Sequence, residues 1–180
     1  MGKRFTKINE SHQRFIEDQK IFFVGTAAED GRVNVSPKGM DSFRVFDSKR
    51  IIWLNFTGSG NETAAHVLRN PRMTIMFCSF EDKPMILRLY GMAKIFHERD
   101  EVFQDYMNQF DNTIGARQII DLEVDLVQTS CGFGVPYMDF NKERLLLRSW
   151  SEKKGPEKIK DYWEENNKLS IDDFETGIFE

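Results

Sequence analysis

Cysteine and histidine are scarce in this chain, which has two cysteines and three histidines among its 180 residues. Cys78 and Cys131 form no Cys-x-x-Cys motif, which argues against a disulfide framework and against a zinc ribbon. His12, His66 and His97 fall in separate predicted elements without the spacing of metal ligands, so we expect no metal site. Because cysteines without a disulfide pattern are typical of a reducing compartment, we expect a cytoplasmic protein.

Excess positive charge and long apolar runs are also missing. The chain has 25 lysines and arginines against 29 aspartates and glutamates, which gives a formal net charge of −4. Nucleic-acid-binding domains usually carry a net basic face, so we expect no nucleic-acid partner. No apolar stretch reaches the roughly 20 residues of a transmembrane helix, so we expect no membrane partner either. The sequence contains no recognisable Ser/His/Asp triad, and no catalytic residue can be named from it.

Aromatic residues, by contrast, are abundant: the chain has 16 Phe, 4 Tyr and 3 Trp. Hydrophobic alternation predicts six or seven strands in hairpin order, with one short helix inserted and helices at both ends. Meandering, aromatic-rich strands close most readily into a small barrel, so the expected fold class is mainly β, a β-barrel with peripheral helices. We expect a single domain over residues 1–180, in which residues 142–180 form a C-terminal helical extension.

A few residues carry specific local predictions. Ser11 is expected to cap the first helix and Asn61 the inserted helix. Gly31 is expected to take a positive φ in the first hairpin turn, and Gly91 to mark a bulge or a close approach in the longest strand. The last predicted strand alternates so strictly that Asp121 is expected to face solvent.

Two neighbouring segments carry more chemistry than the rest of the chain. One strand ends in Lys38 and Gly39, and a later strand runs through Gly58-Ser59-Gly60 into the helix that begins near Asn61. A glycine loop before a helix presents unpaired backbone N–H groups at the positive end of the helix dipole, where a phosphate is favoured. Lys38 can supply the countercharge. The sequence therefore predicts a phosphate-binding corner.

Taken in order along the chain, these residues resemble the FMN-binding split barrel family named after pyridoxamine 5′-phosphate oxidase. The segments that carry the resemblance are Val33 to Gly39, Trp53-Leu54-Asn55, Gly58-Ser59-Gly60-Asn61, Asn70-Pro71-Arg72-Met73 and Leu87-Arg88-Leu89-Tyr90-Gly91. The tail is similar to one branch of the family in two further segments, Ser130 to Pro136 and Asn167 to Asp172.

The resemblance implies a homodimer of split barrels that holds two FMN molecules, each in a cleft between the subunits. It implies an FMN-dependent oxidoreductase that acts on a small-molecule substrate or electron donor. The implied cofactor-binding residues are Asn34, Val35, Ser36 and Pro37 along the flavin ring, Lys38 at the phosphate, Leu54 and Asn55 at the ring or ribityl chain, Ser59, Gly60, Asn61 and Thr63 around the phosphate, and Arg88 on the long strand.

Departures from the oxidase itself bear on the substrate. The oxidase usually has an Arg-Lys pair where this chain has Gly60-Asn61, and a glutamine where this chain has Ile86. Its arginine-histidine substrate clamp has no counterpart in Leu145 to Glu180. These losses argue against pyridoxamine 5′-phosphate as the substrate, and the sequence names no other.

Several alternatives stay open at this point. The same fold can hold flavin, haem or another tetrapyrrole without turnover, as a carrier or sensor, or can act as an interaction module after its site has drifted. Arg88 is as well placed for a cross-strand or subunit ion pair as for a cofactor contact. Cys131 is expected to pack as a small apolar group within its glycine-rich loop.

Overall fold

The computed structural model describes residues 2–179, and within them the chain forms eight strands and four helices. The strands are β1 (Lys3–Phe5), β2 (Phe22–Thr26), β3 (Asn34–Lys38), β4 (Phe43–Asp47), β5 (Arg50–Phe56), β6 (Arg72–Cys78), β7 (Ile86–Phe96) and β8 (Ala116–Ser130). The helices are α1 (Glu10–Asp18), α2 (Glu62–Arg69), α3 (Phe103–Met107) and α4 (Leu146–Asn166). Among the described helices, none combines the length and the apolar character that crossing a bilayer requires.

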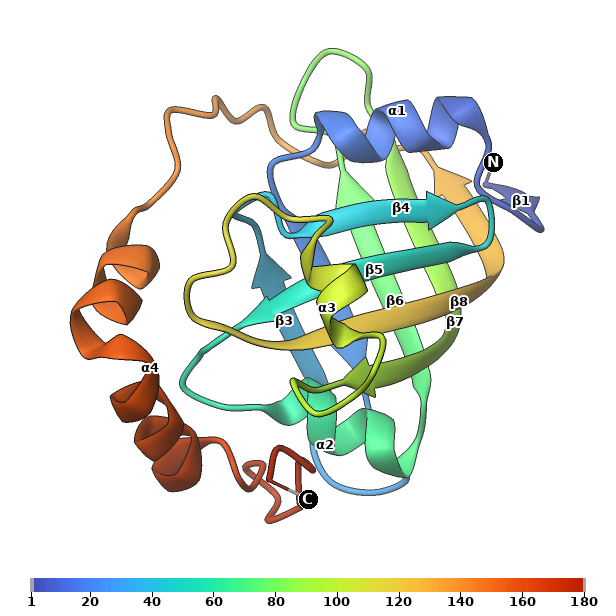
Figure 1. Ribbon diagram of the computed structural model, residues 1–180. Helices are drawn as coiled ribbons and strands as arrows, with labels where there is room; N and C mark the ends of the chain where they lie inside the picture. The colour runs from blue at the N-terminus through green and yellow to red at the C-terminus, as the bar shows by residue number, and fades with distance from the viewer. Residues whose placement is uncertain (1, 180) are drawn as a thin grey trace.

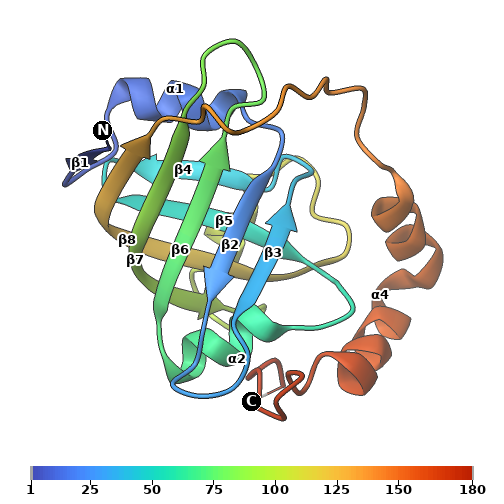
Figure 2. The same ribbon diagram turned by 180° about the vertical axis from the view of Figure 1, so that it is seen from behind.

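All the strands belong to one antiparallel sheet. Its order is β3-β2-β6-β7-β8-β5-β4, and β1 pairs with β8 off this path. The sheet curls so that β4 and β5 cross in front of β2, β6 and β7, while α1 and α2 lie at opposite ends of the barrel (Figure 1). Figure 2 shows β3, β2, β6 and β7 side by side as the opposite wall. The predicted mainly β fold with peripheral helices is confirmed.

The core explains why these residues form strands. The larger apolar cluster fills the barrel and includes the fully buried Trp53 and the almost fully buried Phe77. A smaller cluster lies under α3, where Phe103 and Tyr106 pack against Ile52 and Leu54 of β5. Alternate residues of β5 thus enter different clusters, so both faces of this strand are buried.

Two glycines take the conformations that the sequence predicts. Gly31 has a φ of 85° in the turn between β2 and β3. The pairing of β7 with β8 shifts register between Tyr90 and Gly91, and a Cβ at Gly91 would lie 1.9 Å from the carbonyl oxygen of Glu123. Only glycine allows the two strands to approach so closely.

The predicted start of α1 is wrong by two residues. Asn9, and not Ser11, is the N-cap: its Oδ1 accepts a hydrogen bond from the backbone N–H of His12 at 2.9 Å. The ring Nδ1 of His12 accepts in turn from the Asn9 N–H at 3.4 Å, which completes a capping box. Ser11 lies inside the helix and donates its hydroxyl to Asn9 Oδ1.

Two exposure predictions are also wrong. Asp121 is buried, because α3 covers this part of β8 and brings the hydroxyl of Tyr106 to 3.1 Å from its carboxylate. Arg50 pairs with the same carboxylate, its Nε lying 3.0 Å from Oδ1, and this hydrogen bond raises the pKa of Arg50. Cys131 is exposed, because the chain leaves the barrel at the end of β8.

The segment that follows β8 runs outside the barrel. Residues 131–145 form an arm without regular structure that leads away from the barrel to α4 (Figure 1). Gly155, with a φ of 74°, breaks α4 into two pieces, and Pro156 begins the second piece. The last residues then return to the start of α2 (Figures 1 and 2). This return brings residues 166–171 to the candidate site.

Candidate functional site

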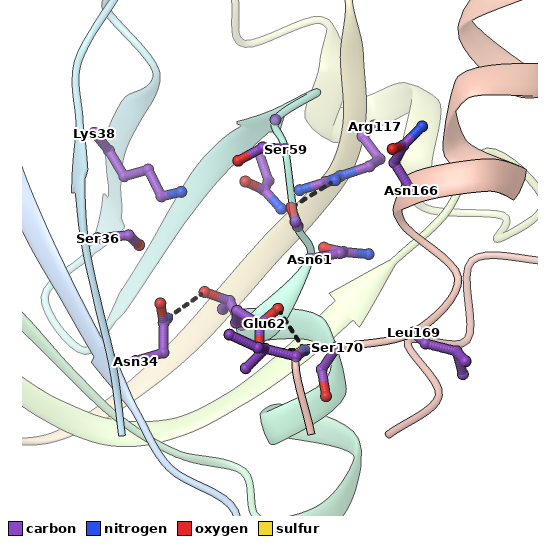
Figure 3. A pocket seen from close by; sticks show the side chains of 15 residues that line it. Asn34, Ser36, Lys38, Ser59, Asn61, Glu62, Arg117, Asn166, Leu169 and Ser170 are labelled. Carbon is purple, nitrogen blue, oxygen red and sulfur yellow. Dashed lines mark hydrogen bonds between the residues drawn. The ribbon is translucent and has the colours of Figure 1, made fainter. Parts of the chain in front are cut away.

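A cavity of about 560 Å³ opens where β3, the end of β5 and the start of α2 meet the returning tail (Figure 3). This volume is within the range of small-molecule sites in proteins. The residues that line it are Asn34, Ser36, Lys38, Asn55, Gly58, Ser59, Gly60, Asn61, Glu62, Thr63, Arg117, Asn166, Leu169, Ser170 and Ile171.

The loop before α2 presents backbone donors to this cavity. Within residues 2–179, the amide N–H groups of residues 59–63 have no hydrogen-bond acceptor. Asn61 is the N-cap residue of α2, as the sequence predicts, but its side chain makes no capping hydrogen bond. The unpaired amides therefore lie at the positive end of the α2 dipole, which is the geometry of an anion site.

Two cations line the same cavity, the partly buried Lys38 and the buried Arg117. Burial, followed by the charge of Arg117, lowers the pKa of Lys38 to about 8. Burial lowers the pKa of Arg117, whose side chain belongs to a residue only 5% exposed, to about 9. Among the described residues, neither cation forms an ion pair with a carboxylate. An anionic ligand would supply the missing countercharge.

Several polar side-chain atoms around the cavity are buried without a partner among residues 2–179. They are Ser36 Oγ, Asn55 Oδ1, Asn61 Oδ1 and Nδ2, and Arg117 Nε. Buried polar atoms are almost always hydrogen-bonded in folded proteins, so such a group of unpaired atoms needs an explanation. A polar ligand in the cavity provides one.

A hydrogen-bonded network ties β3 to α2 at the rim of the cavity. Asn34 donates its amide to Thr26 Oγ1 at 3.1 Å and to Thr63 Oγ1 at 3.2 Å. Thr26 Oγ1 also lies 3.1 Å from Nδ1 of the buried His66. The alternation of β3 places Asn34, Ser36 and Lys38 on one face, toward the cavity (Figure 3).

The structure brings together eight of the twelve cofactor-binding residues that the resemblance implies. These eight line the cavity: Asn34, Ser36, Lys38, Asn55, Ser59, Gly60, Asn61 and Thr63. The other four lie elsewhere. Val35 is 69% exposed on the opposite face of β3, and Leu54 is buried in the cluster under α3. Arg88 donates to Ser130 Oγ at 3.2 Å, and Pro37 lines a second groove.

That second groove, of about 690 Å³, adjoins the cavity at Lys38, which lines both. It runs between the end of β3 and the arm, and its lining is more apolar than that of the cavity. Its apolar residues are Ile21, Pro37, Met40, Phe80, Met138, Phe140, Leu146 and Leu147. A ligand that extends from the cavity past Lys38 therefore reaches a more apolar lining, which also carries charged side chains such as Lys20 and Glu81.

Sequence reasoning missed Arg117 and the contribution of the tail. Arg117 is the second residue of β8, and its Nη1 donates to the carbonyl of Gly60 at 3.1 Å (Figure 3). The polar pair Arg117-Gln118 precedes the alternating part of this strand, and this was the one available signal. Gln118 is fully buried and accepts from the amide of Asn55 at 3.1 Å.

Sequence comparison matches residues 8–131 to the family model described as pyridoxamine 5′-phosphate oxidase. The chain belongs to this family. A relative in the pyridoxamine 5′-phosphate oxidase family, the protein ustO of Aspergillus flavus, is 41% identical over 126 residues, which are 67% of this chain and 51% of that protein. The chain thus spans about half the length of this relative.

Several solved structures share the fold. A candidate pyridoxamine 5′-phosphate oxidase from Lactobacillus delbrueckii is 19% identical with a TM-score of 0.56, covering 68% of this chain and 94% of its own. HupZ of Group A Streptococcus is 20% identical with a TM-score of 0.55, covering 68% and 99%. An FAD binding protein from Mycobacterium smegmatis is 11% identical with a TM-score of 0.50, covering 70% and 97%. The predicted split-barrel fold is confirmed.

Proposed function

We propose that this chain is a flavoprotein that binds FMN and serves as an FMN-dependent oxidoreductase with a substrate still to be identified. The observation that carries the proposal is the cavity at the start of α2, which is bordered by the unpaired amides of residues 59–63 and by two cations, Lys38 and Arg117, that have no carboxylate partner among residues 2–179. Membership of the pyridoxamine 5′-phosphate oxidase family supports flavin as the ligand class, as does the fold shared with an FAD binding protein.

The charges of the cavity suit a phosphate monoester. Such a group carries a charge of about −1.5 to −2 at pH 7. Lys38 and Arg117 supply two positive charges, and the N-terminus of α2 adds a fraction of one more. Glu62 contributes one negative charge to the lining, and its carboxylate accepts a hydrogen bond from the Ile171 N–H. The unpaired Asn61 and Ser36 side chains supply further hydrogen-bonding groups to the phosphate and its chain.

The neighbouring groove suits the rest of an FMN molecule. Past Lys38 the lining becomes more apolar, and Pro37 is part of it, as the resemblance implies for the flavin ring. FMN, when bound, supplies the hydride chemistry of the reaction. The chain itself holds the phosphate, orients the ribityl chain through polar side chains of β3 and β5, and keeps water from the ring with apolar ones.

A haem ligand is less well supported by this site. Haem iron takes its axial ligand from histidine, cysteine, methionine or tyrosine. Among residues 2–179, none of these types lines the cavity, and the adjoining groove offers only the methionines Met40 and Met138. His66 lies behind it, with its Nδ1 engaged by Thr26. We therefore propose flavin as the cofactor. The reduction experiment described below distinguishes an enzyme from a protein that only carries flavin.

We propose that the functional unit is a homodimer, in which each subunit is a single domain with residues 142–180 as its extension. The arm and the first turn of α4 expose six large apolar side chains. Val35 of the edge strand β3 and Val33 just before this strand are exposed as well. The six are Phe133, Tyr137, Met138, Phe140, Leu145 and Leu146. Apolar surface of this extent is typical of protein interfaces. A monomer in sedimentation equilibrium at micromolar concentration would contradict the homodimer.

Titration of the protein with FMN and with riboflavin, followed by quenching of flavin fluorescence, tests the proposed function. We expect FMN to bind at least tenfold more tightly than riboflavin, because only FMN fills the phosphate site with charge-assisted hydrogen bonds. Bleaching of the bound flavin by NADH or NADPH, with recovery in air, would identify an oxidoreductase. Equal affinity for the two flavins would refute the phosphate site.

Lys38 makes the affinity for FMN depend on pH. Its pKa of about 8 means that the empty site is mostly cationic at pH 7 and mostly neutral above pH 9. Because phosphate binds the cationic form, the dissociation constant of FMN should rise as pH increases through 8, by about 5- to 30-fold in total, which corresponds to about 1–2 kcal/mol.

Lys38→Ala is the matched control for this pH dependence. At pH 7 the variant should bind FMN more weakly by the same 1–2 kcal/mol, the scale of one charge-assisted hydrogen bond. Its dissociation constant should change little between pH 7 and 8.5, where Lys38 titrates in the native protein. If the variant kept both the native affinity and the native pH profile, Lys38 would not contact the phosphate.

A further inference from the structure

The tail that follows α4 is bound to the phosphate corner, although it lies outside the family-matched residues 8–131. The carboxylate of Glu62, in the first turn of α2, accepts from the Ile171 N–H at 3.1 Å (Figure 3). The N–H of Arg32, beside β3, donates to the carboxylate of Asp172 at 2.7 Å. Glu62 lies in α2 and Arg32 in the turn before β3, so the tail ties these two segments together beside the cavity.

Asn167 is the tail residue that reaches the site itself. It is fully buried. Its Nδ2 donates to the carbonyl of Gly58 at 3.0 Å, and its Oδ1 accepts from Nη1 of Arg117 at 2.6 Å. Its own backbone is tied as well, because its N–H donates to the carbonyl of Trp163 at 2.8 Å and its carbonyl accepts from Thr176 Oγ1 at 2.6 Å. Every hydrogen-bonding group of Asn167 therefore has a partner.

These contacts set the direction in which the glycine loop presents its amides. Asn167 holds the carbonyl of Gly58, and Arg117 holds the carbonyl of Gly60. In a trans peptide the C=O and the following N–H point to opposite sides. The structure has no cis peptide bond within residues 2–179. With the two carbonyls tied on the side of Asn167 and Arg117, the N–H groups of Ser59 and Asn61 point the other way.

From this geometry we propose that Asn167 is the positioning residue of the phosphate site, acting through the Gly58 carbonyl and the Arg117 guanidinium. The inference rests on the proposed function, since it concerns the same phosphate group. Asn167 touches no ligand atom in this scheme, and it does not line the cavity. Its removal frees the loop to turn its amides and leaves Arg117 with one partner fewer. The affinity for the phosphate suffers, and the affinity for the flavin ring does not.

The test is Asn167→Ala, measured as the ratio of the riboflavin dissociation constant to the FMN dissociation constant. We expect this ratio to fall about tenfold, with the riboflavin constant within twofold of the native value. A residue that merely stabilises the fold would change both constants together. The matched control is Asn108→Ala, because Asn108 is exposed, lies outside the cavity, and its side chain accepts only from the Gln104 amide within α3. Its ratio should stay native.

Asn167→Asp keeps the test decisive if the alanine variant does not fold. It preserves the shape and the contact with Arg117 but cannot donate to Gly58, and it adds a negative charge behind the loop, so the ratio should fall here too. If native protein binds FMN and riboflavin equally, the proposed function fails. If native protein prefers FMN and the folded Asn167 variants keep the native ratio, the positioning role alone is refuted.

Discussion

Replacing Arg117 with methionine should weaken FMN binding about 100-fold. Arg117 is the most deeply buried cation of the cavity, and it has no carboxylate partner among the described residues. A charge-assisted hydrogen bond in such surroundings contributes about 1.5–3 kcal/mol, and a tenfold change in affinity corresponds to about 1.4 kcal/mol. Methionine keeps much of the side-chain volume and removes the charge, so the loss of affinity reports the charge. Flavin fluorescence quenching at pH 7 measures it.

Arg88→Met is the control for this prediction. The resemblance implies Arg88 as a cofactor contact, yet the structure pairs it with Ser130 and leaves it out of the cavity. The FMN dissociation constant of Arg88→Met should therefore stay within about twofold of the native value, because the substitution removes no contact between the protein and the ligand. The reverse pattern, with affinity lost at Arg88 and kept at Arg117, would place the phosphate elsewhere.

Replacing Gly91 with alanine should lower the free energy of unfolding by about 3 kcal/mol. The new Cβ would lie 1.9 Å from the carbonyl oxygen of Glu123 and 3.1 Å from Leu122 Cδ1. The first of these atoms is backbone, so a strand in the middle of the sheet has to shift. Overpacking of a tight interior costs about 1–3 kcal/mol, and a clash with backbone belongs at the upper end. Urea unfolding without added flavin measures the change.

Gly25→Ala serves as the matched control, because Gly25 also lies within a strand of the same sheet. A Cβ at Gly25 meets nothing nearer than 3.8 Å, where it would contact the Thr74 carbonyl. Alanine there should change the free energy of unfolding by less than about 1 kcal/mol, with stabilisation as the expected sign. Equal losses in the two variants would mean that glycine is needed for flexibility and not for the close approach of β7 to β8.

Much of the phosphate corner was predictable because its signals are local. The alternation of β3 puts Asn34, Ser36 and Lys38 on one face, and Gly58 to Asn61 read as a loop before a helix. The error at Asp121 has a tertiary cause. Asp121 looks solvent-facing in an alternating strand, but a helix from another part of the chain covers it. Leu54 and Arg88, which the resemblance implies as cofactor contacts, lie outside the cavity, and their role stays a prediction.

The amino-acid pattern alone sufficed for the β-rich fold, the glycine turns and the anion-binding loop, since each depends on residues close together in the chain. The complete set of residues that form the cavity could be identified only from the tertiary structure. Arg117 and Asn167 form a hydrogen bond although they are 50 residues apart in the sequence, and Asn167 and Gly58 form one although they are 109 residues apart. The pairing of β5 with β8 and the return of the tail bring these residues together. Periodicity in the sequence predicts single strands and helices, and it predicts neither of these long-range contacts.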